Sequence, residues 1–269
     1  MPYLSRMNTV KKLRLGNFRR IPLDVFLMKQ LTDLYLHECY MLQQQTFNGF
    51  SNVTTLTLNE VFIYKKTLIH VLSKCPLLKT LNLLQEPQHI QSDDNSSLIE
   101  LFECLPLIEN LTICLWAFEC FDELPRELPT SLQNLKYMCL YHVFLGGDNE
   151  YTMPILAFFS RSSPNLEKIK LRISTLKKII IYPDLLEPDS HADEESGVSE
   201  DYSDIQLKNL NELEIENLGS KKVELQFVKL MLLMSPVLKT LKIFLNEEVA
   251  EDKELEVLNI LLSCPHTYV

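Results

Sequence analysis

Aliphatic residues recur along the whole chain in the spacing L-x-x-L-x-L, in which the intervening positions are mostly polar. The fourth positions of the nine copies are Leu13, Leu34, Leu56, Leu81, Leu111, Met138, Ile169, Leu213 and Leu241. The last three positions alternate apolar, polar, apolar, so they predict a short strand that turns both aliphatic side chains to one face. Such a recurrence is typical of leucine-rich repeats.

The distance between successive copies increases along the chain. The fourth positions are 21, 22, 25, 30, 27, 31, 44 and 28 residues apart. The longer steps contain amphipathic segments that are followed by a proline, and we predict helices over residues 68–74, 98–104, 155–162, 227–234 and 257–262. Because proline cannot continue a helix and favours extended backbone before it, each proline is predicted to end a helix and start a strand.

We therefore expect an α/β fold, namely a leucine-rich-repeat solenoid bent into a horseshoe arc. About nine parallel strands would line the concave side and the helices the convex side, because one repeat cannot bury its apolar face without its neighbours. A doubly wound parallel sheet is the alternative. It fits less well, since such sheets use longer apolar strands and glycine-rich turns, whereas this chain has six glycines.

The repeats divide the chain into two parts. Residues 1–220 are predicted to be leucine-rich repeats, and residues 221–269 a further C-terminal repeat that contains the ninth copy. Residues 263–269 begin a helix-to-strand turn with no strand after it, so this repeat is either truncated there or capped by that piece. Residues 187–204 hold eight acidic residues and no Lys or Arg, which predicts a disordered loop. Residues 179–182 are apolar enough for an extra strand, and residues 118–131 are expected to be a long connection.

The acidic loop changes the meaning of the net charge. The formal charge is -10, but outside the loop 28 acidic residues face 26 basic ones. A nearly neutral body gives no broad cationic surface for phosphates, so nucleic acid is not expected as a partner. No apolar run reaches the length of about 18 residues that spans a membrane. The seven dispersed cysteines contain no CxxC pair, which favours a reducing compartment, the cytoplasm or the nucleus.

Signatures of catalysis are missing from the sequence. It contains no phosphate-binding loop, dinucleotide fingerprint or metalloprotease motif. Cys139 and His142 could face Cys114 across two predicted strands, as zinc ligands or as a nucleophilic pair, but a zinc site normally has closely spaced ligand pairs. We favour buried structural side chains there, and we expect no catalytic residue, metal or cofactor.

The intervening strand positions form a candidate binding face for a protein target. The predicted partner-binding residues are Arg14, Tyr35, His37, Tyr137, Tyr141, Lys168, Lys170, Arg172, Glu212 and Glu214. The cationic row that ends at Arg172 can be interpreted in two ways. It forms cross-strand ion pairs with the glutamates of the next strand, which we favour, or it is a recognition strip for an acidic partner segment, with the tyrosines as anchors.

Three stretches carry a resemblance to a known family. Residues 72–81 (LSKCPLLKTL) and residues 162–169 (SSPNLEKI) resemble the repeat unit of plant F-box/FBD/LRR-repeat proteins. Residues 128–136 (LPTSLQNLK) look like the link before a late repeat of that family. The segment from Phe227 through Lys239 is similar to the start of the FBD module, and it is the most specific of these motifs.

The resemblance implies a non-enzymatic function. Members of this family are taken to be substrate-recognition subunits of Skp-cullin-F-box ubiquitin ligases, in which the F-box docks the ligase and the repeats hold the target. No F-box counterpart precedes the first repeat at Val10, so we expect this chain to recognise a target without docking the ligase itself. A Skp-type linker is expected as a partner only if an F-box exists upstream.

A second reading is the repeat tail of an intracellular immune receptor or of a GTPase regulator. An F-box or a nucleotide-binding domain upstream would separate these two readings.

Overall fold

The computed structural model describes residues 9–21, 25, 27–41, 50–85, 89–91, 96–121, 123–145, 152–174 and 205–262. The strands are β1 (Lys12–Gly16), β2 (Asp33–His37), β3 (Tyr40–Met41), β4 (Thr55–Asn59), β5 (Phe62–Tyr64), β6 (Thr80–Leu84), β7 (Ile90–Gln91), β8 (Asn110–Cys114), β9 (Tyr137–Val143), β10 (Lys168–Ile173), β11 (Glu212–Leu218) and β12 (Thr240–Leu245). The helices are α1 (Lys65–Ser73), α2 (Leu98–Glu103), α3 (Trp116–Glu119), α4 (Thr152–Ser162), α5 (Lys222–Leu233) and α6 (Glu251–Leu262).

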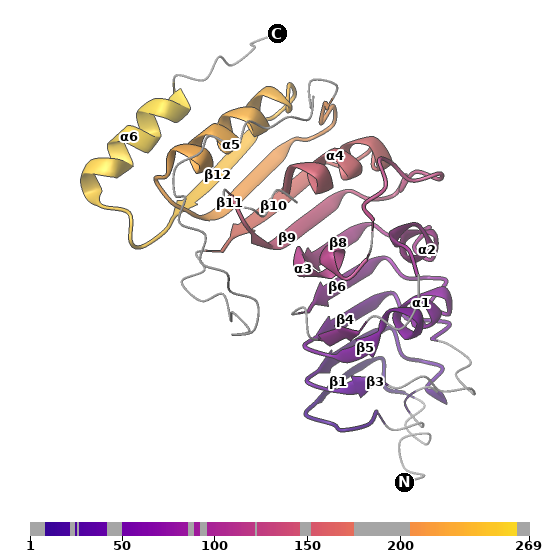
Figure 1. The fold of residues 1–269 in the computed structure, drawn as a ribbon. Coiled ribbons are helices and arrows are strands. Elements are labelled where there is room, and N and C mark those ends of the chain that lie inside the picture. The colour runs from indigo at the N-terminus through magenta and orange to yellow at the C-terminus, as the bar shows by residue number, and fades with distance from the viewer. Residues whose placement is uncertain are drawn as a thin grey trace, which may run out of the picture.

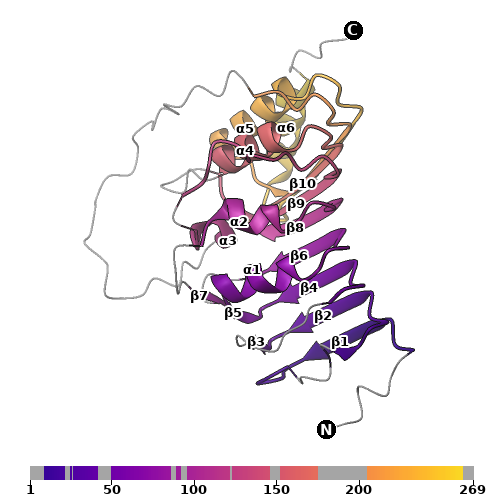
Figure 2. The ribbon, with the colours of Figure 1, turned by 90° about the vertical axis from the view of Figure 1, so that its right-hand side faces the viewer.

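Nine strands form one parallel sheet, as predicted, and each L-x-x-L-x-L copy supplies one of them (Figure 1). The strands follow one another in chain order, β1-β2-β4-β6-β8-β9-β10-β11-β12. A doubly wound sheet would reverse its strand order and carry helices on both faces. Here the order does not reverse, and the helices lie on one face of the sheet (Figure 2).

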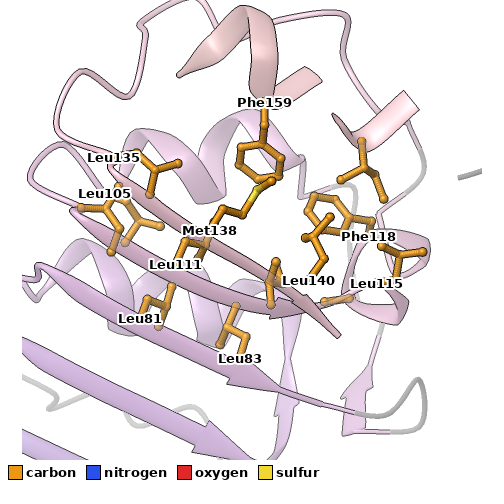
Figure 3. Close-up of a cluster of buried hydrophobic side chains, with 14 of the residues drawn as sticks. Leu81, Leu83, Leu105, Leu111, Leu115, Phe118, Leu135, Met138, Leu140 and Phe159 are labelled. Carbon is orange, nitrogen blue, oxygen red and sulfur yellow. The ribbon is translucent and has the colours of Figure 1, made fainter. Parts of the chain in front are cut away.

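The aliphatic positions build the core between the sheet and the helices. Leu56 and Leu58 of β4 are completely buried, whereas the three other residues of that strand are half-buried. Equivalent positions pair across the sheet, so the core continues from strand to strand, for example from Leu81 to Leu111 to Met138. Figure 3 shows Leu83, Leu111 and Leu140 packed together with aromatic rings such as Phe118 and Phe159. The repeats therefore share one continuous apolar core.

Tight turns connect the helices to the strands. Pro76 occupies the second position of a turn that the Leu78 N–H closes by donating to the Cys75 carbonyl at 3.1 Å. The same hydrogen bond recurs at Ile108, Leu166 and Leu238. Strand β6 begins at Thr80, four residues after Pro76. The prediction that each proline starts a strand was therefore inexact, since the proline starts a turn and the strand follows it.

Several elements differ from the sequence prediction. The short parallel sheet β3-β5-β7 was not predicted, and α3 (Trp116–Glu119) begins before the connection expected over residues 118–131 and extends into it. Helices α1, α4, α5 and α6 start earlier than predicted, by up to six residues in α6, whereas α2 starts at Leu98 as predicted. The predicted strand over residues 179–182 and the acidic loop over residues 187–204 lie outside the described residues.

Candidate protein-binding face

We define the open face as the side of the nine-stranded sheet turned away from the helices. It is formed by the residues that flank the two buried aliphatic positions of each strand, and the in-phase register arranges them in three rows. The first row is Lys12, Asp33, Thr55, Thr80, Asn110, Tyr137, Lys168, Glu212 and Thr240. The second row is Arg14, Tyr35, Thr57, Asn82, Thr112, Cys139, Lys170, Glu214 and Lys242. The third row, at the carboxyl ends of the strands, includes His37, Asn59, Leu84, Tyr141, Arg172, Glu216 and Phe244.

The predicted partner-binding residues all belong to these rows, but they form two groups rather than one. The amino-terminal group consists of Arg14, Tyr35 and His37. The guanidinium of Arg14 lies over the ring of Tyr35, 5.4 Å from its centroid. The amide nitrogen Nδ2 of Asn59 donates to the Tyr35 hydroxyl at 3.3 Å and lies 3.0 Å from His37 Nδ1. Asn59 thus orients two candidate residues on the preceding strand.

Small polar side chains separate the two groups. Asn82 donates to the Thr57 hydroxyl at 2.9 Å, and Asn110 donates to the Thr80 hydroxyl at 3.3 Å. Each bond joins neighbouring strands and satisfies the side chains within the face. The middle of the open face is therefore polar and uncharged.

Two tyrosines of β9 begin the carboxyl-terminal group. The ammonium of Lys168 lies 5.8 Å from the ring centroid of Tyr137, and the guanidinium of Arg172 lies 4.7 Å from that of Tyr141. Cys139 lies between the tyrosines, and burial raises the pKa of its thiol to about 11, although hydrogen bonding to Tyr137 opposes the shift. A thiolate is therefore disfavoured at neutral pH, which does not fit a nucleophilic role.

Strands β10, β11 and β12 carry a network of ion pairs. Lys168 Nζ lies 2.9 Å from a carboxylate oxygen of Glu212 and 3.6 Å from one of Glu214. Lys170 lies between Glu214 and Glu216, with Nζ–O distances of 2.6 and 2.5 Å. The remaining contacts are those of Arg172 with Glu216, and of Lys242 with Glu212 at 2.6 Å. The cross-strand pairing favoured from the sequence is thus present.

Hydrogen bonding within the network favours the ionised forms of Glu212 and Glu216. Hydrogen bonds from Lys242 and Lys168 lower the pKa of Glu212. Partial burial would raise the pKa of Glu216, but hydrogen bonds from Lys170 and Arg172 lower it overall. Lys242 was not among the predicted residues, although its place in the second row could have been derived by extending the repeat to the last strand.

Cys114, Cys139 and His142 do not come close enough, within the described residues, to hold a metal together. Cys139 pairs with Thr112 rather than with Cys114, which pairs with Tyr141. Within the described residues, the group of His, Cys, Asp or Glu close enough to share a metal is His37, Glu38 and Glu60, whose ligand atoms lie within 4.8 Å of one another. This group is partly exposed, and Asn59 contacts the ring of His37, so we assign it no metal.

The parallel sheet and the leucine spacing are those expected of leucine-rich repeats, and comparisons with known proteins agree. Residues 5–99 match the family model "FBD-associated F-box protein At5g56370, LRR repeats". The chain is also 24% identical to "F-box/FBD/LRR-repeat protein At1g13570" of Arabidopsis thaliana, over 90% of this chain and 67% of the relative. The predicted resemblance to plant F-box/FBD/LRR-repeat proteins is therefore confirmed.

The helices of this chain are short. Across the described residues, none of them is both long and apolar enough to cross a membrane.

Proposed function

We propose that the repeats form an arched solenoid whose concave side is the open face, and that this face binds a protein target without catalysing a reaction. The observation that carries the proposal is the pair of tyrosines on β9, each covered by a cation from β10. Tyrosine and arginine are the residue types that most often dominate the binding energy of protein interfaces. The proposed recognition strip therefore consists of Tyr137, Tyr141, Lys168 and Arg172.

The strip is well suited to binding because its side chains are already held in place. Arg172 lies over the Tyr141 ring and bonds to Glu216, so its guanidinium loses little freedom when a partner arrives. Ordering a long side chain otherwise costs about 0.5–1.5 kcal/mol on binding. The side chain of Arg172 is still 45% exposed, so its outer edge remains available to a partner.

The charges of the strip indicate what kind of partner it fits. On β10 to β12 the open face carries four cations and three glutamates, and each glutamate is paired. We infer that the strip meets a partner segment with aromatic or apolar anchors and few charges of its own. A strongly acidic segment would have to displace the glutamates from the cations they already contact.

Similarity to F-box/FBD/LRR-repeat proteins supports a place in ubiquitin ligation. We propose that this chain recognises the target in the manner of the substrate-receptor subunit of a Skp-cullin-F-box ligase. In this proposal the open face supplies recognition, and docking to the ligase is a separate property.

Capture from a plant cell extract tests the binding proposal. The tagged chain is compared with a Tyr137→Ser/Tyr141→Ser variant and with a Lys66→Glu/Lys229→Glu control on the exposed side of α1 and α5. We expect the captured amount of at least one protein to fall about tenfold or more with the tyrosine variant, the loss that about 1.4 kcal/mol produces. The control should capture this protein as the wild type does. Equal melting temperatures exclude misfolding. Capture that depends on Lys66 and Lys229 but not on the tyrosines would contradict the proposal.

The ligase part of the proposal is tested in the same captures. A Skp-type linker that co-purifies with both wild type and tyrosine variant would support a docking site away from the open face. Targets held without any linker would restrict the function to recognition.

A further inference from the structure

We propose that a pocket at the carboxyl ends of β4, β6, β8 and β9 binds the carboxamide of an asparagine or glutamine side chain from the protein partner. The pocket has a volume of about 190 Å³, and its walls include Asn59, Glu60, Leu84, Gln85, Tyr141 and His142. Pockets for drug-sized ligands are usually about 300–1,000 Å³, so this one suits a single side chain. The proposal rests on the proposed function, since it specifies part of the partner that the open face binds.

Gln85 provides the first reason to expect a ligand. Its side chain is 2% exposed, and its Oε1 accepts a hydrogen bond from the Val61 N–H at 2.9 Å. That bond fixes which end of the amide is oxygen, and the opposite atom, Nε2, has no hydrogen-bond partner among the described residues. A buried donor without an acceptor destabilises the fold, and a carbonyl oxygen bound in the pocket would relieve this cost. We expect the Gln85 amide to shift towards the pocket when that oxygen enters.

Glu60 supplies the complementary group. Its carboxylate is an acceptor, and no Lys or Arg in the described part of the chain forms an ion pair with it. A ligand that satisfies both groups presents an acceptor to Gln85 and a donor to Glu60. A primary carboxamide has both groups on one small plane.

Other side chains fit this pair less well. A carboxylate would be repelled by Glu60, and an ammonium or a guanidinium would give Gln85 no acceptor. An aliphatic side chain would leave both polar groups unpaired, which is how hydrogen-bonding sites reject apolar analogues.

The location of the pocket ties it to the proposed recognition strip. Tyr141 belongs to both the pocket and the strip, because it lines the pocket and its ring lies under the guanidinium of Arg172. A partner segment that contacts Tyr141 would therefore bring a neighbouring side chain to the pocket mouth.

The test uses a small probe, N-acetyl-glutamine methylamide, and the whole chain labelled with ¹⁵N. We expect the probe to shift the side-chain amide signals of Gln85 in a saturable manner, with a dissociation constant of about 1 mM, as is usual for a ligand of this size. The matched probes, N-acetyl-glutamate methylamide and N-acetyl-methionine methylamide, should bind at least tenfold more weakly. The Gln85 signals are assigned from their absence in a Gln85→Glu variant, which keeps an acceptor for Val61.

Three variants make the result specific. Gln85→Glu and Glu60→Gln should each weaken binding of the glutamine probe at least tenfold, as measured from the backbone amide shifts around the pocket. Glu167→Gln is the control, because Glu167 is an exposed glutamate that pairs with Lys136 and does not line the pocket. If Gln85→Glu does not fold, the comparison of Glu60→Gln with Glu167→Gln still tests the site.

Equal shifts with all three probes, or no shift with any, would overturn the carboxamide site. This outcome is separable from failure of the proposed function, because the probes need no partner and partner capture needs no probe.

Discussion

Lys65 shows how a single side chain can depart from the pattern that organises the rest of the chain. It is the first residue of α1, it is completely buried, and its ammonium lies 5.6 Å from the ring centroid of Phe121. Among the described residues, Nζ has no hydrogen-bond partner. A buried charge with such poor compensation destabilises the folded state.

We predict that Lys65→Met stabilises the protein. Methionine keeps the length of the side chain and removes the charge, and replacing buried charges by apolar groups of similar volume is often stabilising by about 1–4 kcal/mol. Unfolding in urea measures the difference. Lys66→Met, on the exposed neighbour, should change stability by less than about 0.5 kcal/mol. A lower stability of Lys65→Met would show that the ammonium makes a stabilising contact.

The individual residues of the candidate site could be predicted from the sequence to different degrees. The rows of the open face follow from the repeat alone, because every strand places the same motif position on the same face; Tyr141 and Arg172 were found in this way. Gln85 and Lys65 could not be found, since their burial depends on how distant segments close over them.

At the scale of elements, the sequence predicted strands better than short accessory pieces. The nine long strands share a six-residue motif, whereas β3, β5 and β7 have two or three residues each and carry no period. The starts of α1 and α5 were predicted too late, because the first turns of these helices contain polar residues such as Lys65 and Lys222, which break the apolar pattern. Strand positions follow from periodicity, and helix starts depend on packing that the pattern does not contain.

Asparagines before several strands join one repeat to the next. The amide nitrogen of Asn165 donates to the Gln133 carbonyl at 2.8 Å, and that of Asn209 donates to the Pro164 carbonyl at 2.7 Å. We predict that Asn165→Ala and Asn209→Ala each lower the free energy of unfolding by about 1 kcal/mol, the usual contribution of one such bond. Asn211→Ala is the control, because its side-chain amide makes no hydrogen bond within the described residues. Equal effects at all three positions would contradict this role.

The ion pairs of β10 to β12 predict a pH dependence. The pKa values of Glu212 and Glu216 are lower in the folded chain than the ordinary glutamate value of 4.5. Their stabilisation is therefore complete above about pH 4.5 and is lost as the pH falls through the lowered values. Glu212→Gln/Glu216→Gln should destabilise the chain by about 1 kcal/mol at pH 7. The double variant should also lose less stability than the wild type as the pH falls.

Melting temperatures between about pH 3 and pH 7 test this prediction. Glu167→Gln is the control, because in the described part of the chain Glu167 forms one ion pair, the exposed pair with Lys136 at 3.7 Å. Wild type and double variant that lose stability in parallel on acidification would show that the network contributes nothing to the acid response.

At the scale of the whole molecule, the stacking of equal repeats explains both the core and the binding face. Inner strands bury their aliphatic side chains almost completely, whereas Leu13 and Leu15 of β1 and Ile243 of β12 are half-buried. Among the described residues, these end strands have a neighbouring strand on one side only. The same stacking turns isolated sequence positions into rows that reach across nine strands. The sequence thus predicted the positions of the face and the ion pairs between β10 and β11, but not that Lys242 of β12 joins them.

Photo-crosslinking tests the central claim, that the partner binds across the open face, most directly. A photoreactive p-benzoylphenylalanine replaces Tyr141 in one variant and Lys229, on the opposite side, in another, and both are irradiated with the captured partner. We predict a covalent adduct from position 141 and none from position 229. An adduct from position 229 with none from position 141 would contradict the claim.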